Sequence, residues 1–115
     1  MNLSTLTAIS PIDGRYASKV DALRSIASEY GLMRARIEVE LAWLKSLASH
    51  PQIDEVPPLS GQAIAQIEAI VAEFGTTDGE RVKEIEDTTN HDVKAIEYFI
   101  KEKFTANPEL SAISE

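Results

Sequence analysis

The chain has 115 residues, of which 43% are hydrophobic and 26% charged, and its net charge is −8. This length suits one domain with a single core, and the composition is that of a globular protein rather than a disordered one. The negative charge argues against nucleic-acid or anionic-membrane binding, and no apolar run reaches the roughly 18 residues of a membrane span. With no cysteine and two distant histidines, we expect no disulfide, no thiolate nucleophile and no metal site. A cytoplasmic protein fits these features.

The first 17 residues carry no helical period and predict an irregular segment. Within it, the stretch from Ser10 to Gly14 is typical of a turn, because proline presets φ and Asp-Gly tolerates the left-handed region. Arg15 and Tyr16 follow this turn directly. A guanidinium and a phenol in this place could bind an anion. Equally, Arg15 could be a surface charge and Tyr16 a core anchor.

A first helix is expected to begin at Ser18, which with Asp21 resembles a capping box. Its apolar residues recur at helical spacing up to Tyr30, and Gly31 favours a break or bend near that point.

Residues 32–49 predict the next helix, which ends before Pro51 because a residue that precedes proline avoids the α region. Arg36 and Glu40 are expected to form an exposed pair on its polar side. The apolar face is broad and is made of Leu32, Met33, Ile37, Val39, Leu41, Trp43, Leu44, Leu47 and Ala48.

Residues 51–59 hold three prolines and predict a connector. Ser60 is the expected N-cap of the helix that follows, and Gly75 is its expected C′ glycine. Residues 76–79 are expected to turn the chain. The apolar stripe of this helix is Ala63, Ile64, Ile67, Ile70, Val71 and Phe74.

Two further helices are expected in the last third of the chain. Residues 79–87 predict a thin surface helix with Val82 and Ile85 as its buried face. Residues 93–104 predict a strongly amphipathic helix, which the proline at position 108 stops. No segment alternates with period two for long, so the expected fold is all-α: a small bundle of four or five helices behind an irregular N-terminal segment.

Two hydroxyls, an amide, an imidazole and a carboxylate lie together between these last two helices, at Thr88, Thr89, Asn90, His91 and Asp92. Helix capping is one interpretation, since Thr89 with Asp92 three residues later is a variant of the capping box. Capping does not explain His91. The alternative is that the segment binds a polyanion together with Arg15 and Tyr16, with His91 as a donor or proton handler. His91 and Asp92 would each need partners from elsewhere, because neighbours on a helix point about 100° apart.

Two segments of the chain strongly resemble the N-terminal domain of the bacterial adenylosuccinate lyase family, which belongs to the fumarase/aspartase superfamily. They are Ser10 to Tyr16 (SPIDGRY) and Thr88 to Phe99 (TTNHDVKAIEYF), and the likeness covers essentially all 115 residues. The resemblance implies a fumarase/aspartase-like all-α fold. Residues 1–110 would form an N-terminal helical substrate-binding domain, and residues 111–115 would begin a central long-helix domain.

The resemblance also implies a reaction, a substrate class and a set of contacts. The family eliminates fumarate from adenylosuccinate, which gives AMP, and from the succinylated aminoimidazole carboxamide ribotide of purine biosynthesis, with no metal or organic cofactor. Arg15 and Tyr16 would lie at the substrate, Arg15 near its phosphate. Asn90, His91 and Asp92 would line the same pocket, and Thr88 and Thr89 are further candidates. His91 would assist the reaction or position the substrate.

The family's serine base and main acid histidine have no counterpart motif in these residues, and its members are homotetramers whose sites combine several subunits. The resemblance therefore implies that the 115-residue chain is inactive alone. Two alternatives stay open. One is another lyase of the superfamily, of the argininosuccinate type, and the other is a stand-alone helical interaction module.

Overall fold

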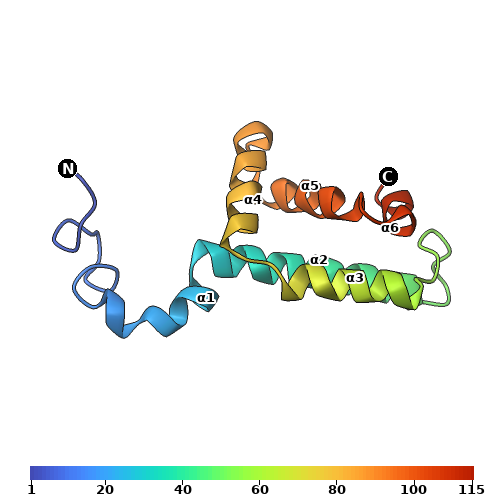
Figure 1. Ribbon diagram of the computed structural model, residues 1–115, viewed down its shortest axis with the longest axis horizontal. Coiled ribbons are helices and arrows are strands. Elements are labelled where there is room, and N and C mark those ends of the chain that lie inside the picture. The colour runs from blue at the N-terminus through green and yellow to red at the C-terminus, as the bar shows by residue number, and fades with distance from the viewer. The chain divides into compact units, whose positions relative to one another are not determined.

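A computed structural model describes all residues from 1 to 115 (Figure 1). Its regular secondary structure is entirely helical, which confirms the predicted all-α class. The chain divides into two compact units, an N-terminal unit (Met1–Leu32) and a C-terminal unit (Met33–Glu115). None of the helices combines the length and the apolar character needed to cross a membrane.

The N-terminal unit has an irregular first segment, as predicted, followed by short helices. These are the 3-10 helices η1 (Ala17–Lys19) and η2 (Asp21–Leu23) and the single-turn α1 (Arg24–Ala27). The continuous helix expected from Ser18 is therefore wrong, and neither 3-10 helix has a side-chain cap. The large apolar residues of this stretch are exposed, and the exposed fraction of Ile26 is 73%. A helical spacing of apolar residues does not stabilise a helix when those residues pack against nothing.

The predicted turn before Arg15 is confirmed. Gly14 was expected to serve the turn by adopting a left-handed conformation, but it is needed for a different reason. Asp13 N–H donates to the Ser10 carbonyl at 3.1 Å, and Tyr16 N–H donates to the Pro11 carbonyl at 2.8 Å. Gly14 does not have a positive φ. A Cβ at this position would instead lie 2.5 Å from the carbonyl oxygen of Thr5, so glycine is required by a close backbone approach.

Helix α2 (Glu29–Ser49) begins just after a break at Ser28, three residues before the position that Gly31 suggested. Ser28 Oγ accepts the Gly31 N–H at 3.1 Å and donates to the Arg24 carbonyl, so one hydroxyl joins the two helix ends. Gly31 itself is helical. A Cβ there would lie 2.4 Å from the Ile26 carbonyl oxygen, so glycine allows the first turn of α2 to pass close to α1.

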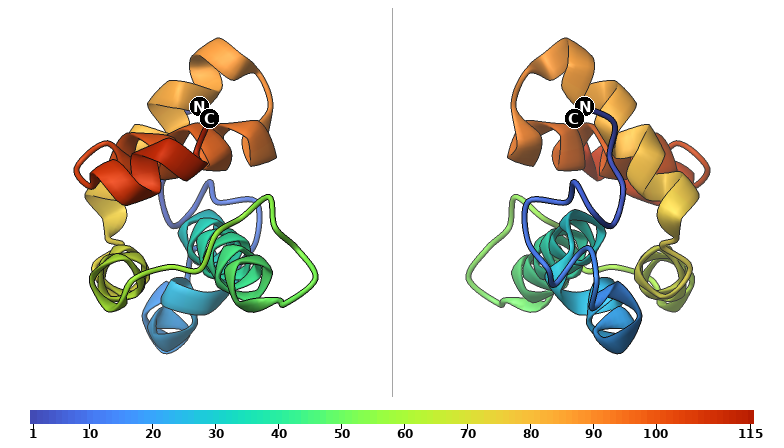
Figure 2. Two further views of the ribbon diagram at one scale, coloured as in Figure 1. Left: turned by 90° about the vertical axis from the view of Figure 1, so that its right-hand side faces the viewer. Right: turned by 90° about the vertical axis from the view of Figure 1, so that its left-hand side faces the viewer.

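The C-terminal unit holds the rest of α2 and four more helices: α3 (Gly61–Ala72), α4 (Thr76–Thr89), α5 (Asp92–Phe104) and α6 (Pro108–Ile113). After the loop of residues 51–59, α3 runs back alongside α2, and the two appear end-on in Figure 2. Helix α4 leads from this layer to α5 and α6, which form a second layer (Figures 1 and 2). The helices predicted over 32–49 and 93–104 are thus confirmed, and so is the helix after Ser60, although it ends at Ala72 and leaves Phe74 outside it.

The boundary between α3 and α4 differs from the prediction. The Ser60 N-cap is confirmed, since its Oγ accepts the Ala63 N–H at 3.1 Å. Gly75 is not a C′ glycine: it is the extended N-cap residue of α4, and its N–H donates to Asp78 at 2.9 Å. Thr76 to Gly79 therefore form the first helical turn rather than a chain reversal, because Asp78 captures a free N–H and Gly79 is buried.

The core of the C-terminal unit lies between the two layers. Within it, Phe74 and Phe99 meet edge to face, with ring centroids 5.6 Å apart. The broad apolar face predicted for α2 is only partly buried, since Val39 and Trp43 are 66% and 62% exposed. The largest fully buried side chains are Ile37, Leu41, Ile67, Val82, Ile96, Phe99 and Leu110.

Candidate functional site

The segment that the sequence singled out is a sharp junction between α4 and α5. Helix α4 ends at Thr89, and Asn90 follows in the left-handed conformation, with φ 51° and ψ 33°. It is the one non-glycine residue with a positive φ. Asparagine tolerates this region better than most residues, and the Asn90 N–H closes α4 by donating to the Glu86 carbonyl at 2.7 Å. The chain thereby reverses within two residues.

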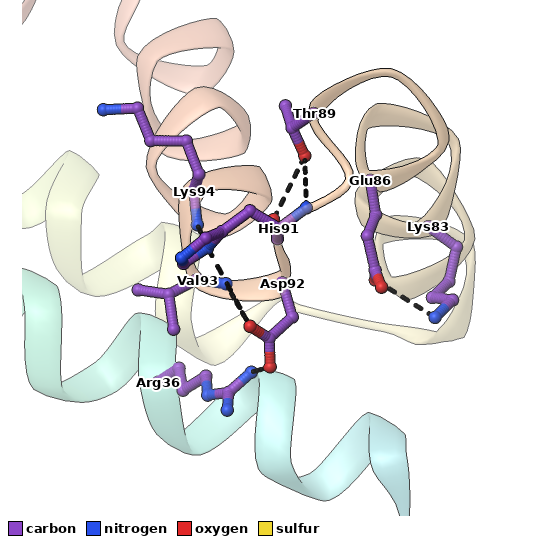
Figure 3. Close-up of polar contacts among 8 residues, drawn as sticks. All are labelled: Arg36, Lys83, Glu86, Thr89, His91, Asp92, Val93 and Lys94. Carbon is purple, nitrogen blue, oxygen red and sulfur yellow. Dashed lines mark hydrogen bonds and ion pairs between the residues drawn. The ribbon is translucent and has the colours of Figure 1, made fainter.

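His91, rather than Thr89, is the N-cap of α5, so the predicted capping box is wrong (Figure 3). Its backbone is extended, and its Nδ1 accepts the Lys94 N–H at 3.2 Å. Thr89 supports the junction differently: its hydroxyl accepts the His91 N–H at 3.3 Å and donates to the His91 carbonyl at 3.1 Å. Because Asn90 turns the chain, the cap of α5 falls on His91, two residues after Thr89, and the imidazole becomes the capping acceptor.

This cap determines what the His91 ring can offer to a ligand. A nitrogen that accepts a hydrogen bond carries no proton, so the neutral ring has its proton on Nε2. The His91 side chain is 65% exposed, and no other hydrogen bond holds its ring. His91 therefore presents a single N–H donor to its surroundings while its other nitrogen fixes it to α5.

Asp92 opens α5 and has both carboxylate oxygens engaged (Figure 3). Oδ1 accepts the Val93 N–H at 2.9 Å, and Oδ2 accepts from Arg36 Nη1 at 2.7 Å. The Arg36 guanidinium, and after it the Val93 N–H, lowers the pKa of the Asp92 carboxyl below its ordinary value. Asp92 Oδ1 lies 3.9 Å from His91 Nδ1, which is too far for a hydrogen bond. The two side chains bond to different partners, as expected for neighbours that point in different directions.

The backbone at the start of α5 is not an open anion site. The Val93 and Lys94 N–H groups are already bonded to Asp92 and His91. The donors that remain are side-chain groups without a hydrogen bond inside the chain: the Thr88 hydroxyl, the Asn90 amide and His91 Nε2. All three residues are exposed. The junction can therefore hold a polar ligand through neutral donors.

Arg15 and Tyr16 belong to the N-terminal unit and lie against each other, with the guanidinium carbon 5.3 Å from the phenol ring centroid. Tyr16 is 47% exposed, so its alternative interpretation as a core anchor is wrong. Arg15 is exposed and has no carboxylate partner, which leaves its guanidinium free to bind an anion.

Arg36 is the residue at this site that the sequence did not single out. Its spacing to Glu40 indicated a surface pair within α2, whereas its guanidinium contacts Asp92, 56 residues further along the chain. A contact between residues so far apart leaves no periodic signal in one sequence. No group of three or more His, Asp or Glu side chains is arranged to hold a metal ion.

Comparison with known proteins gives close matches over the whole chain. It is 58% identical over 115 residues to adenylosuccinate lyase from Escherichia coli K12 and 59% identical to that from Haemophilus influenzae. Identity to the Legionella pneumophila (strain Corby) adenylosuccinate lyase is 45% over 112 residues, or 97% of this chain. The chain spans about a quarter of the length of these curated relatives, 25% in each case, at their N-terminal end. No family model matches the chain.

Proposed function

The chain is related along its whole length to the N-terminal quarter of bacterial adenylosuccinate lyases, and from this premise we propose that it forms the corresponding part of such a lyase. The proposed reaction eliminates fumarate from adenylosuccinate, leaving AMP, and from the succinylated aminoimidazole carboxamide ribotide in purine biosynthesis. The observation that carries the proposal is an identity of 57–59% maintained over all 115 residues in several relatives of that name.

Within this reaction, the chain supplies substrate-binding and positioning groups. Asn90 and His91 donate hydrogen bonds to the substrate from the amide and from Nε2, with the Thr88 hydroxyl as a further donor. The absence of internal partners for these donors supports this role. Arg15, with its free guanidinium, binds the substrate phosphate beside Tyr16.

Asp92 and Thr89 support the site in this proposal. Both oxygens of Asp92 are engaged by Arg36 and Val93, and the Thr89 hydroxyl is engaged by the backbone of His91. They hold the junction in the shape that presents Asn90 and His91. The proton-abstracting base and the main acid belong to the remainder of the enzyme, which we propose to be a cytoplasmic homotetramer without a metal or organic cofactor.

Substitution of His91 in the full-length enzyme tests the proposal, because the imidazole has two separable tasks. His91→Asn keeps a side-chain oxygen that can accept the Lys94 N–H, but it removes the Nε2–H donor. His91→Ala removes both. We expect both variants to lose about 10²–10⁴-fold in fumarate release, the range for a group that assists the reaction or positions the substrate. Only His91→Ala should also lose stability, by about 1 kcal/mol for the missing cap.

The assay measures fumarate release from adenylosuccinate, with argininosuccinate as a second substrate, and urea denaturation follows stability. Near-normal activity of His91→Asn would show that His91 serves only as a helix cap. Turnover of argininosuccinate in place of adenylosuccinate would contradict the proposed substrate. A full-length enzyme that released no fumarate from either compound would contradict the proposed function itself.

A further inference from the structure

An ion pair connects helix α2 to the junction that carries His91. Arg36 Nη1 lies 2.7 Å from Asp92 Oδ2, and the Arg36 side chain is 30% exposed (Figure 3). Such a pair contributes little to global stability when it is partly exposed. Its position matters more than its strength, because it joins α2 to the first residue of α5.

The first turn of α5 also holds the His91 ring. His91 Nδ1 accepts the Lys94 N–H, and Asp92 Oδ1 accepts the Val93 N–H, so both side chains are fixed to the same turn. The direction of His91 Nε2 therefore depends on how this turn is placed. Arg36 acts on the turn through the other oxygen of Asp92.

Apolar packing between α2 and α5 is incomplete at this end of the helices. A hollow of about 330 Å³ lies between them, and Val39 on its α2 side is 66% exposed. Further along the same helices, Leu41 and Phe104 are buried. In the first turn of α5, Ala95 is buried but Val93 is only half-buried beside this hollow, so the Arg36–Asp92 contact adds to apolar packing in defining how the turn is placed. The hollow is lined by Ala35, Arg36, Val39, Glu40, Val93 and Ile96.

We propose that Arg36 is a positioning residue for the lyase reaction, holding the first turn of α5 through Asp92 so that the His91 Nε2–H meets the substrate. This inference rests on the proposed function. Arg36 itself does not contact the reacting atoms. The ordinary pKa of an aspartate, 3.8, lies far below neutral pH, and Arg36 lowers the pKa of Asp92 further, so the contact is between charged groups at neutral pH.

The test uses the full-length enzyme with Arg36→Met, which keeps much of the side-chain length without the charge, and Arg36→Lys, which keeps the charge. Arg34→Met is the matched control, because Arg34 lies on the same helix, is exposed and forms no ion pair. We expect Arg36→Met to lower kcat on the order of 10–100-fold, because small misplacements of a positioned group have effects of this size. KM and the melting temperature should change little. Arg36→Lys should recover part of the loss, and Arg34→Met should resemble the wild type.

A double variant that combines Arg36→Met with His91→Ala separates a positioning role of Arg36 from its other roles. If Arg36 acts through His91, Arg36→Met should cause no further loss of kcat once the imidazole is absent. An additional loss in the double variant, or a loss of kcat that follows a fall in melting temperature, would overturn the inference. So would wild-type kinetics of Arg36→Met in an active enzyme. Failure of the proposed function is distinct, because the unmodified enzyme would then release no fumarate.

Discussion

Asn90 and His91 each combine a backbone task with a side chain available to a ligand. Asn90 adopts a left-handed conformation that costs most residues about 1–2 kcal/mol, and its amide has no partner in the chain. His91 caps α5 with one ring nitrogen and leaves the other exposed. Capping and ligand binding were alternatives at the level of sequence. The geometry makes them compatible, because they use different atoms of the same residues.

Asn90 allows the two tasks to be measured separately in the full-length enzyme. Asn90→Gly keeps access to positive φ and removes the amide, whereas Asn90→Ala removes the amide and strains the backbone. We expect Asn90→Ala to be less stable than Asn90→Gly by about 1 kcal/mol in urea denaturation. Both should show reduced kcat/KM for adenylosuccinate. Full activity of the glycine variant would remove Asn90 from the proposed substrate contacts.

At the scale of helices, α4 and α5 are joined by buried apolar faces and by charges along their edges. Arg81 on α4 donates two hydrogen bonds to the Glu102 carboxylate on α5, of 2.5 and 3.1 Å. Lys103 Nζ lies 3.4 Å from Asp78 Oδ1. The Arg81 contact lowers the pKa of Glu102. These groups are exposed enough that solvent screens them, so they adjust a stability set mainly by the apolar contacts.

The lowered pKa of Glu102 predicts how stability depends on pH. Between its folded-state pKa and its ordinary value of 4.5, the unfolded chain binds more protons, so the free energy of unfolding falls as the pH falls through this window. Arg81→Gln removes the main cause of the shift and should make the acid dependence shallower, with a smaller difference between pH 7 and pH 3. Urea midpoints across this range measure the effect. An unchanged pH dependence in the variant would contradict the assignment.

At the scale of the whole molecule, an open groove of about 390 Å³ runs between α2 and α5 and is largely apolar. Trp43 and Tyr98 line it, with exposures of 62% and 44%. Exposed apolar surface of this kind is typical of interaction sites. The chain also matches only 25% of the length of its relatives. The groove therefore agrees with the proposed function, in which this chain contacts other parts of a larger enzyme.

The 115-residue polypeptide tests directly whether the reacting groups lie outside these residues, as the proposed function requires. We expect it to be helical by circular dichroism and to release no fumarate from adenylosuccinate, while the full-length enzyme releases it under the same conditions. The reason is that the available groups at the junction are hydrogen-bond donors, and the proposed base and main acid lie elsewhere. Measurable turnover by the isolated polypeptide would place the reacting groups within these residues.

Much of the fold could be predicted because apolar periodicity and proline positions depend only on residues that are near one another in the sequence. The helices that contain Ile37, Ile67 and Ile96 have apolar stripes broad enough to reveal their faces, and Pro51 marks a stop that depends only on its neighbours. The stretch after Ser18 was mispredicted, because its apolar spacing is helical but nothing in its unit buries it. Gly75 was assigned to the wrong helix, since glycine is compatible with both a C′ and an N-cap position.

The sequence by itself determined the all-α class, the main helices and the segment in which the chemistry gathers, since periodicity, proline and polar clustering are properties of neighbouring residues. Only the tertiary structure decided how that segment is used. The left-handed Asn90 turns the chain so that His91, rather than Thr89, caps α5. The packing of α2 beside α5 brought Arg36 to Asp92 across 56 residues. Contacts of this kind depend on how helices pack in space, which no local pattern records.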